Sequence, residues 1–253
     1  MLGITAILFV VGLVAGSFVS VVAHRLPRKE SIAGPRSKCP SCDARVAAYD
    51  NVPVLSWLVL RGRCRSCGER ISPRYPLVEL TLGVLYAVVF LVLEEDATEF
   101  ALGIVFVTML ATITLTDLEH RIIPNTVLIA GTVLALAIVI PTDLDSMPER
   151  AIAAAGAGAF LLVAALAYSG GMGMGDVKLG AVMGLYLGRA VAPALAVAFA
   201  TGAIVGIGLM LRHGAAARKQ AVPFGPFLAI GGVVGLLVGD EIIDWYLDTF
   251  FAE

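Results

Sequence analysis

The sequence predicts an all-α polytopic membrane protein of about eight transmembrane helices, with a small cysteine-bearing domain between the first two. Three observations support this fold class. Hydrophobic residues make up 58% of the 253 residues and charged residues 15%, whereas a soluble domain has about half and about a quarter. Several apolar runs approach the ~20 residues that a helix needs to cross a bilayer. Strand-like alternation with turn signals does not recur, which excludes a large soluble α/β core.

Eight apolar runs define the expected helices. Basic residues follow the first run rather than precede it, the reverse of a secretory signal, so we expect a retained helix whose C-terminal end faces the cytoplasm. The sixth run is short and is expected to be tilted or to merge with its neighbour, and Gly180, Gly184 and Gly188 permit close helix packing there. The runs are Leu2–Ala23, Leu77–Leu93, Phe100–Thr116, Thr126–Ile140, Ala151–Tyr168, Leu179–Leu187, Ala190–Leu211 and Phe224–Trp245.

Loop charges predict how these helices cross the lipid bilayer. Arg25–Arg74 contains eleven of the 18 Lys and Arg residues and therefore belongs in the cytoplasm. Eight spans then place the acidic loops outside, and only Arg150 and Arg189 depart from the pattern. Asp117 and Asp176 both fall at cytoplasmic helix ends, so they share a depth and can share a site. A seven-span arrangement fits the charges less well.

The two aspartates are the candidate catalytic residues. Acidic groups at a bilayer boundary are costly and tend to mark function. Two carboxylates held close together share a proton, so one can activate water while the other polarises a carbonyl, as in aspartic proteases. The glycine-rich stretch Gly170–Gly175 before Asp176 lets the backbone approach an extended peptide. Structural alternatives remain open: Asp117 caps the helix starting near Pro124, and Asp176 pairs with Lys178 or begins the sixth helix.

Four cysteines predict a metal site in the polar segment. They form two C-x-x-C pairs separated by 21 residues, a spacing close to the four-cysteine zinc pattern. Cytoplasmic thiols stay reduced, so structural disulfides are not expected. A segment of about fifty residues with little apolar content needs a cross-link such as a bound metal ion to fold. We therefore predict zinc, and a structural rather than a catalytic ion, because four thiolates leave no open position for a reaction. A redox pair of cysteines is the alternative. The ligands are Cys39, Cys42, Cys64 and Cys67.

Two further features of the polar residues bear on function. The basic charge of Arg25–Arg74 is explained by membrane orientation, so we expect no nucleic-acid partner. Glu79 lies just inside the second helix, on its cytoplasmic side. It is expected either to pair with an arginine or to join the aspartate site.

Several stretches besides the cysteine pairs form a specific set. They are Gly16–Phe18, Arg25–Pro27, Asp50–Trp57, Leu60–Cys64, Ile71–Glu79, Asp117–Asn125, Gly173–Leu179 and Pro223–Phe227. With these motifs the chain resembles the bacterial prepilin peptidases of type IV pilus and type II secretion systems. Its glycine-aspartate motif is also similar to that of presenilin-type intramembrane proteases. Ser20 and His24 depart from the family pattern, where many relatives carry Asn and Tyr, and neither change touches the aspartates.

The resemblance implies a function and a location. Asp117 and Asp176 would be the catalytic aspartates of a hydrolase, and the four cysteines would bind zinc. The enzyme would cut prepilins or pseudopilins after a glycine, at the cytoplasmic face of the inner membrane. Many relatives then transfer a methyl group from S-adenosylmethionine to the new N-terminus. That second activity accompanies the cysteine-bearing domain.

Four other residues are candidates for positioning the substrate: Gly173, Gly175, Lys178 and Glu79. The first three surround Asp176 in sequence, and Glu79 lies at the expected depth of the aspartates. The chain is expected to divide into a first transmembrane helix, a cytoplasmic zinc-binding domain and a transmembrane protease domain, with the bounds 1–23, 24–76 and 77–253.

Two other function classes compete with the peptidase. A proton-coupled transporter would place acidic groups near the middle of the bilayer and would show inverted repeats with broken helices. Here the acidic groups lie at one face and no repeat is evident. A non-catalytic zinc-bearing membrane scaffold would need only the cysteines.

Overall fold

The fold is almost entirely helical. The computed structural model describes residues 1–34, 37–167, 172–213 and 222–251, in which the extended pairing is limited to two isolated β-bridges, Lys38–Arg45 and Arg63–Arg70. Seven helical segments among these residues are long and apolar enough to cross a membrane. The predicted all-α, multi-pass membrane fold is therefore confirmed. The chain divides into two compact units, Met1–Glu94 and Glu95–Glu253.

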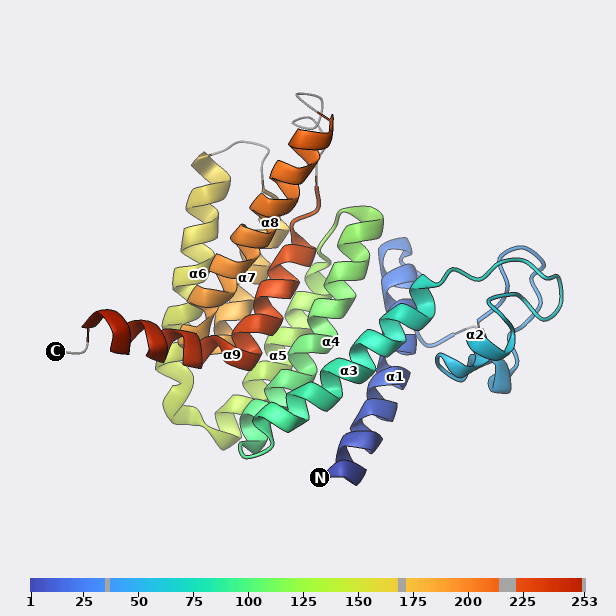
Figure 1. Ribbon diagram of the computed structural model, residues 1–253, viewed down its shortest axis with the longest axis horizontal. Coiled ribbons are helices and arrows are strands. Elements are labelled where there is room, and N and C mark those ends of the chain that lie inside the picture. Colours follow the sequence, from blue (N-terminus) through green and yellow to red (C-terminus); the bar gives the residue numbers. More distant parts are fainter. Residues whose placement is uncertain (35–36, 168–171, 214–221, 252–253) are drawn as a thin grey trace. The chain divides into compact units, whose positions relative to one another are not determined.

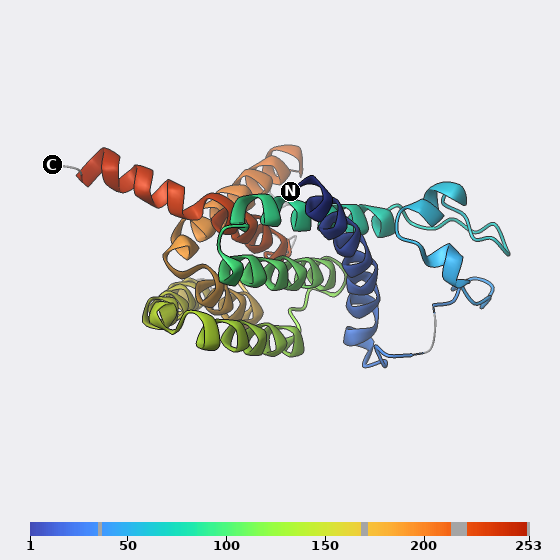
Figure 2. The ribbon, with the colours of Figure 1, turned by 90° about the horizontal axis from the view of Figure 1, so that it is seen from below.

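The first unit is built on two long helices, α1 (Leu2–Arg25) and α3 (Arg74–Leu93), which pack along one another (Figure 2). Small residues bring the two backbones together: a Cβ atom at Gly12 would lie 2.5 Å from the Leu82 carbonyl oxygen. The connection between these helices carries the cysteines. It contains the short helices η1 (Leu26–Arg28), η2 (Ala48–Asn51) and α2 (Leu55–Val59).

The second unit is a bundle of longer helices (Figure 1). Its core is apolar and lies around α4, where Phe106, Leu110 and Ile113 are fully or almost fully buried. Leu179 and Met183 of α7 are fully buried in the same cluster. The elements are α4 (Ala97–His120), α5 (Asn125–Thr142), η3 (Leu144–Ser146), α6 (Met147–Ala167), α7 (Met174–Leu187), η4 (Gly188–Ala190), α8 (Val191–His213) and α9 (Gly225–Phe251).

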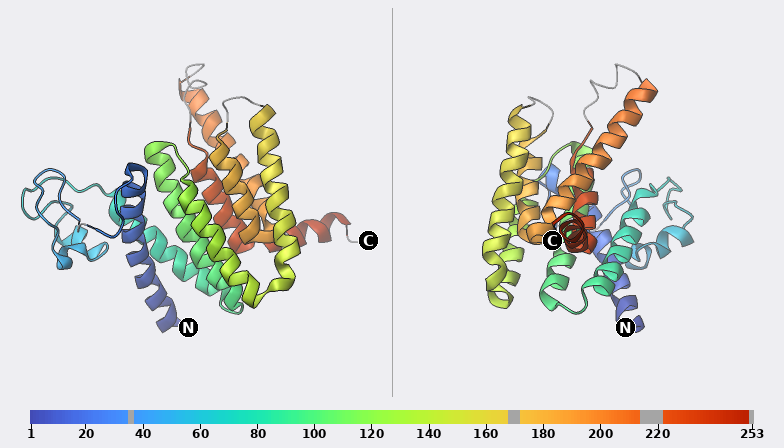
Figure 3. Two further views of the ribbon diagram at one scale, coloured as in Figure 1. Left: turned by 180° about the vertical axis from the view of Figure 1, so that it is seen from behind. Right: turned by 60° about the vertical axis from the view of Figure 1, so that its left-hand side comes forward.

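Close backbone packing joins the helices of this bundle in pairs. α6 packs along α7 and α8 along α9, and both pairs can be followed in Figure 3. A Cβ atom at Gly184 would lie 2.5 Å from the backbone of Ala153, and one at Gly231 would lie 2.1 Å from the Ala194 carbonyl oxygen. Glycine is therefore required at both contacts. The expectation that the glycines of the sixth run permit close packing is confirmed.

Each of the eight apolar runs forms a helix, and the sixth forms the short helix α7. This helix begins at Met174 and has 14 residues, so it is about 21 Å long, less than the ~30 Å hydrocarbon core. It ends at Leu187, and Gly188, with φ +53°, turns the chain into η4 and α8. The count of seven segments treats Met174–Arg212 as one. In Figure 1, α6 and α8 extend beyond the N-terminal ends of α7 and α9.

The last apolar run is interrupted in a way that its composition does not reveal. Val238 has non-helical backbone angles, φ −144° and ψ 15°, and kinks α9. The segment after the kink carries exposed aromatic residues, among them Trp245, Tyr246 and Phe250. Only the part of α9 before Val238 lies in the apolar core.

Candidate active site

Asp117 lies in the last turn of α4 and is 6% exposed. Its Oδ2 atom accepts a hydrogen bond from the backbone N–H of Gly225, at 2.9 Å. Gly225 is the first residue of α9, so the carboxylate lies at the positive end of that helix and satisfies one of its unpaired N–H groups. A side chain at this position would exclude the contact, because a Cβ atom on Gly225 would lie 2.7 Å from Oδ2.

Asp176 lies in the first turn of α7 and is 8% exposed. Its Oδ2 atom accepts a hydrogen bond from the backbone N–H of Gly173, at 3.0 Å. This bond is the acidic half of a capping box, in which the third helical residue reaches back to the N-cap. Gly175, in the same turn, packs against Ile123: a Cβ atom there would lie 2.9 Å from that side chain.

The fold brings the two aspartates together from opposite ends of two different helices. α4 ends, and α7 begins, on the same side of the bundle, and both helices contribute to one core. The chain just after α4 reaches the start of α7, where Ile123 packs against Gly175, the residue before Asp176. The prediction that the residues can share a site is therefore consistent with the geometry.

Of the structural roles considered for the aspartates, the structure supports one, the start of α7 at Asp176. Pro124, not Asp117, is the N-cap residue of α5, and it makes no side-chain cap. Asp176 does begin α7, and its carboxylate caps that helix. Its proposed pairing with Lys178 is wrong, because the Lys178 Nζ atom instead donates to Oδ1 of Asn125, at 3.0 Å.

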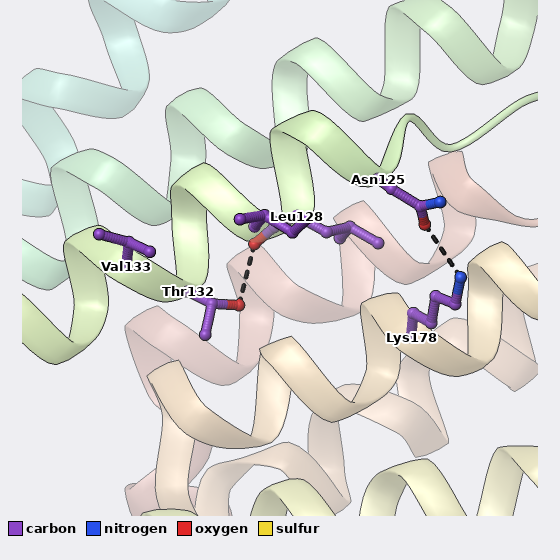
Figure 4. A pocket seen from close by; sticks show the side chains of 6 residues that line it. Asn125, Leu128, Thr132, Val133 and Lys178 are labelled. Carbon is purple, nitrogen blue, oxygen red and sulfur yellow. Dashed lines mark hydrogen bonds between the residues drawn. The ribbon is translucent and has the colours of Figure 1, made fainter.

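Lys178 stands at the end of an open groove between α5 and α7. The groove has a volume of about 420 Å³, and Figure 4 shows Lys178 and Asn125 pointing toward one another beside it. Most of the remaining lining is apolar and comes from α5: Leu128, Ile129, Thr132 and Val133. The groove therefore joins an apolar wall to one cation, on the helix that carries Asp176.

Glu79 is buried in the first unit, at 8% exposure. Its Oε2 atom accepts a hydrogen bond from the backbone N–H of Val54, at 2.7 Å, and its side chain is also bonded to Ser17. The prediction that Glu79 pairs with an arginine is wrong. The backbone N–H of Val54, a residue with a strained conformation, is its partner instead. Val54 has φ +60°, which is an outlier for a β-branched residue. Glu79 thus ties the connecting segment to α3.

The four cysteine sulfur atoms converge to a single cluster. All lie within 4.8 Å of one another, and the Sγ atoms of Cys39 and Cys67 are 3.8 Å apart. Thiolates arranged tetrahedrally about zinc, at about 2.3 Å from the ion, lie about 3.8 Å apart. The predicted clustering of Cys39, Cys42, Cys64 and Cys67 is confirmed, and the group could hold a metal ion.

Two matching loops hold these sulfur atoms. In each, the residue after the second cysteine has positive φ and donates its N–H to the carbonyl of the first: Asp43 to Cys39 at 2.9 Å, and Gly68 to Cys64 at 3.0 Å. In each, the N–H of the first cysteine donates to the carbonyl two residues after the second. The two loops therefore present their cysteines in the same way, to one cluster that could hold a metal ion.

The protonation of the thiols fits a metal site. Backbone N–H groups of Cys67 and Ser66 lower the pKa of the Cys64 thiol to about 7. The pKa of the Cys67 thiol is raised to about 12: the Glu69 N–H lowers it, but burial and the neighbouring thiols outweigh that effect. Four thiolates at this separation repel one another, so a cation is needed for all of them to ionise.

Taken together, fold and site define a multi-pass membrane protein with a buried aspartate pair and a four-cysteine cluster. The bacterial peptidase A24 N-terminal domain model matches residues 10–93, and the type IV leader peptidase family model matches residues 104–207. The chain belongs to the type IV leader peptidase family. The three relatives described next agree with this assignment, and no solved structure matches the chain.

Three curated relatives are each named prepilin leader peptidase/N-methyltransferase. The protein of Bacillus subtilis (strain 168) is 37% identical over 96% of this chain and 97% of its own length. That of Myxococcus xanthus (strain DK1622) is 40% identical over 84% of this chain and 65% of its own length. That of Aeromonas salmonicida (strain A449) is 35% identical over 96% of this chain and 94% of its own length. The transporter and scaffold alternatives find no support here.

Sequence reasoning missed two partners in the site. Gly225 was noted only as part of the stretch Pro223–Phe227, although a glycine before a proline at a helix start is a signal for close backbone approach. Asn125 lies directly after Pro124, and its pairing with Lys178 is a tertiary contact across 53 residues. Gly170 and Gly171, part of the expected peptide-holding stretch, lie outside the described residues.

Proposed function

We propose that the chain is a membrane aspartic endopeptidase that removes the leader peptide of type IV prepilins and pseudopilins, cutting after a glycine. Asp117 and Asp176 are assigned as its catalytic residues. The observation that carries the proposal is the pair of buried carboxylates at the end of α4 and the start of α7. Membership in the type IV leader peptidase family supports the same reaction.

The proposed mechanism uses the two carboxyl groups as an acid and a base. Two nearby carboxyl groups share one proton. The ionised one takes a proton from water as the water oxygen attacks the peptide carbonyl, and the protonated one donates a hydrogen bond to the carbonyl oxygen. The tetrahedral intermediate then collapses: the C–N bond breaks, and the leaving amine takes up the proton that the first carboxylate removed from water. The N–H groups of Gly225 and Gly173 hold Oδ2 of each aspartate, so we assign Oδ1 to water and substrate.

We assign Gly173, Gly175, Lys178 and Glu79 to the positioning of the substrate. The two glycines keep the approach to Asp176 free of side chains, which suits an extended peptide. Lys178 lies two residues beyond Asp176 on α7, at the end of the apolar groove. Glu79 anchors the connecting segment through Val54, which suits a role in holding the leader.

The proposed location follows from the charges. The positive-inside rule supports a cytoplasmic position for the basic segment 24–76, and we assign the aspartates to the same face of the inner membrane. Ion pairing explains the two exceptions on the other side. Arg150 pairs with Glu99, and Arg189 pairs with Asp240, so neither presents an uncompensated positive charge there. The protease domain would be residues 77–253, preceded by helix 1–23.

A second step, methylation of the new N-terminus, is proposed on the names of the relatives. S-adenosylmethionine would supply the methyl group, and zinc would hold the cysteine-bearing segment in its folded form. Incubation of the purified protein with cleaved pilin and labelled S-adenosylmethionine tests this step. Label on the pilin is expected, and its absence would remove the second activity without affecting the peptidase.

The peptidase assignment is tested by Asp117→Asn and Asp176→Asn in a prepilin cleavage assay in membranes. Each substitution keeps the shape of the side chain but removes one carboxylate, so each should abolish cleavage. Asp145→Asn, at an exposed acid on η3, is the matched control and should cleave normally. Full activity in either catalytic variant would overturn the assignment.

A further inference from the structure

A buried arginine lies at the end of the bundle opposite the aspartates. Arg150, in the first turn of α6, is 6% exposed and lines a polar cavity of about 350 Å³. Each nitrogen of its guanidinium donates a hydrogen bond. Nη2 is ion-paired with Glu99, Nη1 donates to the carbonyl oxygens of Tyr186 at 2.6 Å and Leu185 at 3.4 Å, and Nε donates to Ser146 at 3.0 Å.

Apart from Ser146, these partners lie on the two helices that carry the aspartates. Glu99 is in the first turn of α4, whose last turn holds Asp117. Tyr186 is in the last turn of α7, whose first turn holds Asp176. A single guanidinium on a third helix therefore joins α4 and α7 at the ends remote from the carboxylates.

This contact satisfies carbonyl groups at the C-terminal end of the short helix α7. The last carbonyl groups of a helix have no partner within it, and a cation with several donors is the favourable group at that end. Arg150 supplies both. Tyr186 also fixes α7 against its neighbours. Its hydroxyl donates to the Gly131 carbonyl oxygen of α5 at 2.6 Å, and its ring stacks on Phe106 of α4. Ten residues separate Asp176 from Tyr186, about 15 Å along the helix, so a shift at one end moves the other.

A stabilising role alone does not explain the arginine. Replacing a buried ion pair by apolar residues of similar volume is often neutral or stabilising, whereas the pair enforces one arrangement of its partners. At this position the enforced arrangement is the height of α7 relative to α4. That height decides how the two carboxylates face one another.

We propose that Arg150 is a positioning residue for peptide cleavage, which holds Asp176 at the height of Asp117 by bridging Glu99 to the C-terminal carbonyls of α7. This inference rests on the proposed function of the aspartates. It assigns Arg150 no contact with the substrate. Weakening the bridge should therefore act on the rate of the chemical step, because a misplacement of the catalytic groups by about 1 Å, caused by a distant substitution, can cost about 100-fold.

The test compares Arg150→Lys and Glu99→Gln with Arg189→Lys in purified protein cleaving a prepilin. Lysine keeps the charge opposite Glu99 but lacks the planar fork that reaches the α7 carbonyls as well. We expect kcat to fall about 10- to 100-fold with KM changed less than about twofold. The spacing of the two limbs of the pH–rate profile should also change, since it reports the interaction of the pair.

The control Arg189→Lys removes a bidentate arginine at the same end of the bundle. Arg189 pairs with Asp240 and Asp244, which the kink at Val238 separates from the start of α9. It should leave kcat and the pH profile unchanged.

Two results would overturn the inference: wild-type kcat and pH profile in both bridge variants, or a loss of rate equal to the loss of folded protein in a thermal unfolding assay, with the pH profile intact. Cleavage by Asp117→Asn would instead refute the proposed function itself.

Discussion

Gly225→Ala should slow cleavage, because one added carbon atom would collide with the Asp117 carboxylate, which we propose to be catalytic. The Cβ atom would lie 2.7 Å from Oδ2 of Asp117, and 3.2 Å and 3.3 Å from its Cγ and Cβ atoms. Ordinary contact between such atoms begins near 3.4 Å. The Asp117 carboxylate, or the start of α9, must therefore move by about half an ångström or more.

The size of the effect follows from that displacement. Catalytic groups must be held to about 0.5 Å, and an error of about 1 Å can cost about 100-fold in rate. We therefore expect a fall in kcat of about tenfold or more for Gly225→Ala. The lost hydrogen bond from the Gly225 N–H to the carboxylate costs stability of about 1.5–3 kcal/mol.

The assay is cleavage of a purified prepilin at saturating concentration, with thermal unfolding in detergent measured in parallel. Gly208→Ala is the matched control, because nothing lies within 4 Å of a Cβ atom there, and it should cleave like the wild type. A wild-type kcat for Gly225→Ala would refute the reasoning. So would a loss of rate that Gly208→Ala shares.

Three further predictions test other parts of the structure. Gly184→Ala should lower thermal stability by about 1–3 kcal/mol or more, because its Cβ atom would lie 2.5 Å from the backbone of α6, whereas Gly156→Ala, in open space, should not. Cys42→Ser should abolish bound zinc measured by elemental mass spectrometry while Ser41→Ala retains it, and equal zinc content would contradict the proposed ligands. Lys178→Met should raise KM for prepilin with little change in kcat, and an unchanged KM would remove it from substrate positioning.

The helices could be predicted from the sequence because their apolar runs are long and their loop charges are uneven. The cysteine cluster could be predicted because a repeated C-x-x-C spacing has few structural uses. Both rest on local patterns, which a single sequence carries in full.

The remaining features depend on contacts between distant residues. The partner of Asp117 is 108 residues away at Gly225, and that of Lys178 is 53 residues away at Asn125. Glu79 accepts from a backbone N–H, and any residue except proline could supply that donor. Arg150 looked like an exception to the charge pattern because its partner Glu99 lies on another helix. The kink at Val238 has no proline or glycine at the residue itself to mark it.

The central claim is that Asp117 and Asp176 act together on the leader peptide. Its most direct measurement is the intact mass of a prepilin after incubation with the purified protein and with each single Asn variant. The account predicts a product cut after a glycine with the wild type, and uncut prepilin with both variants. A correctly cut product from either variant would contradict it.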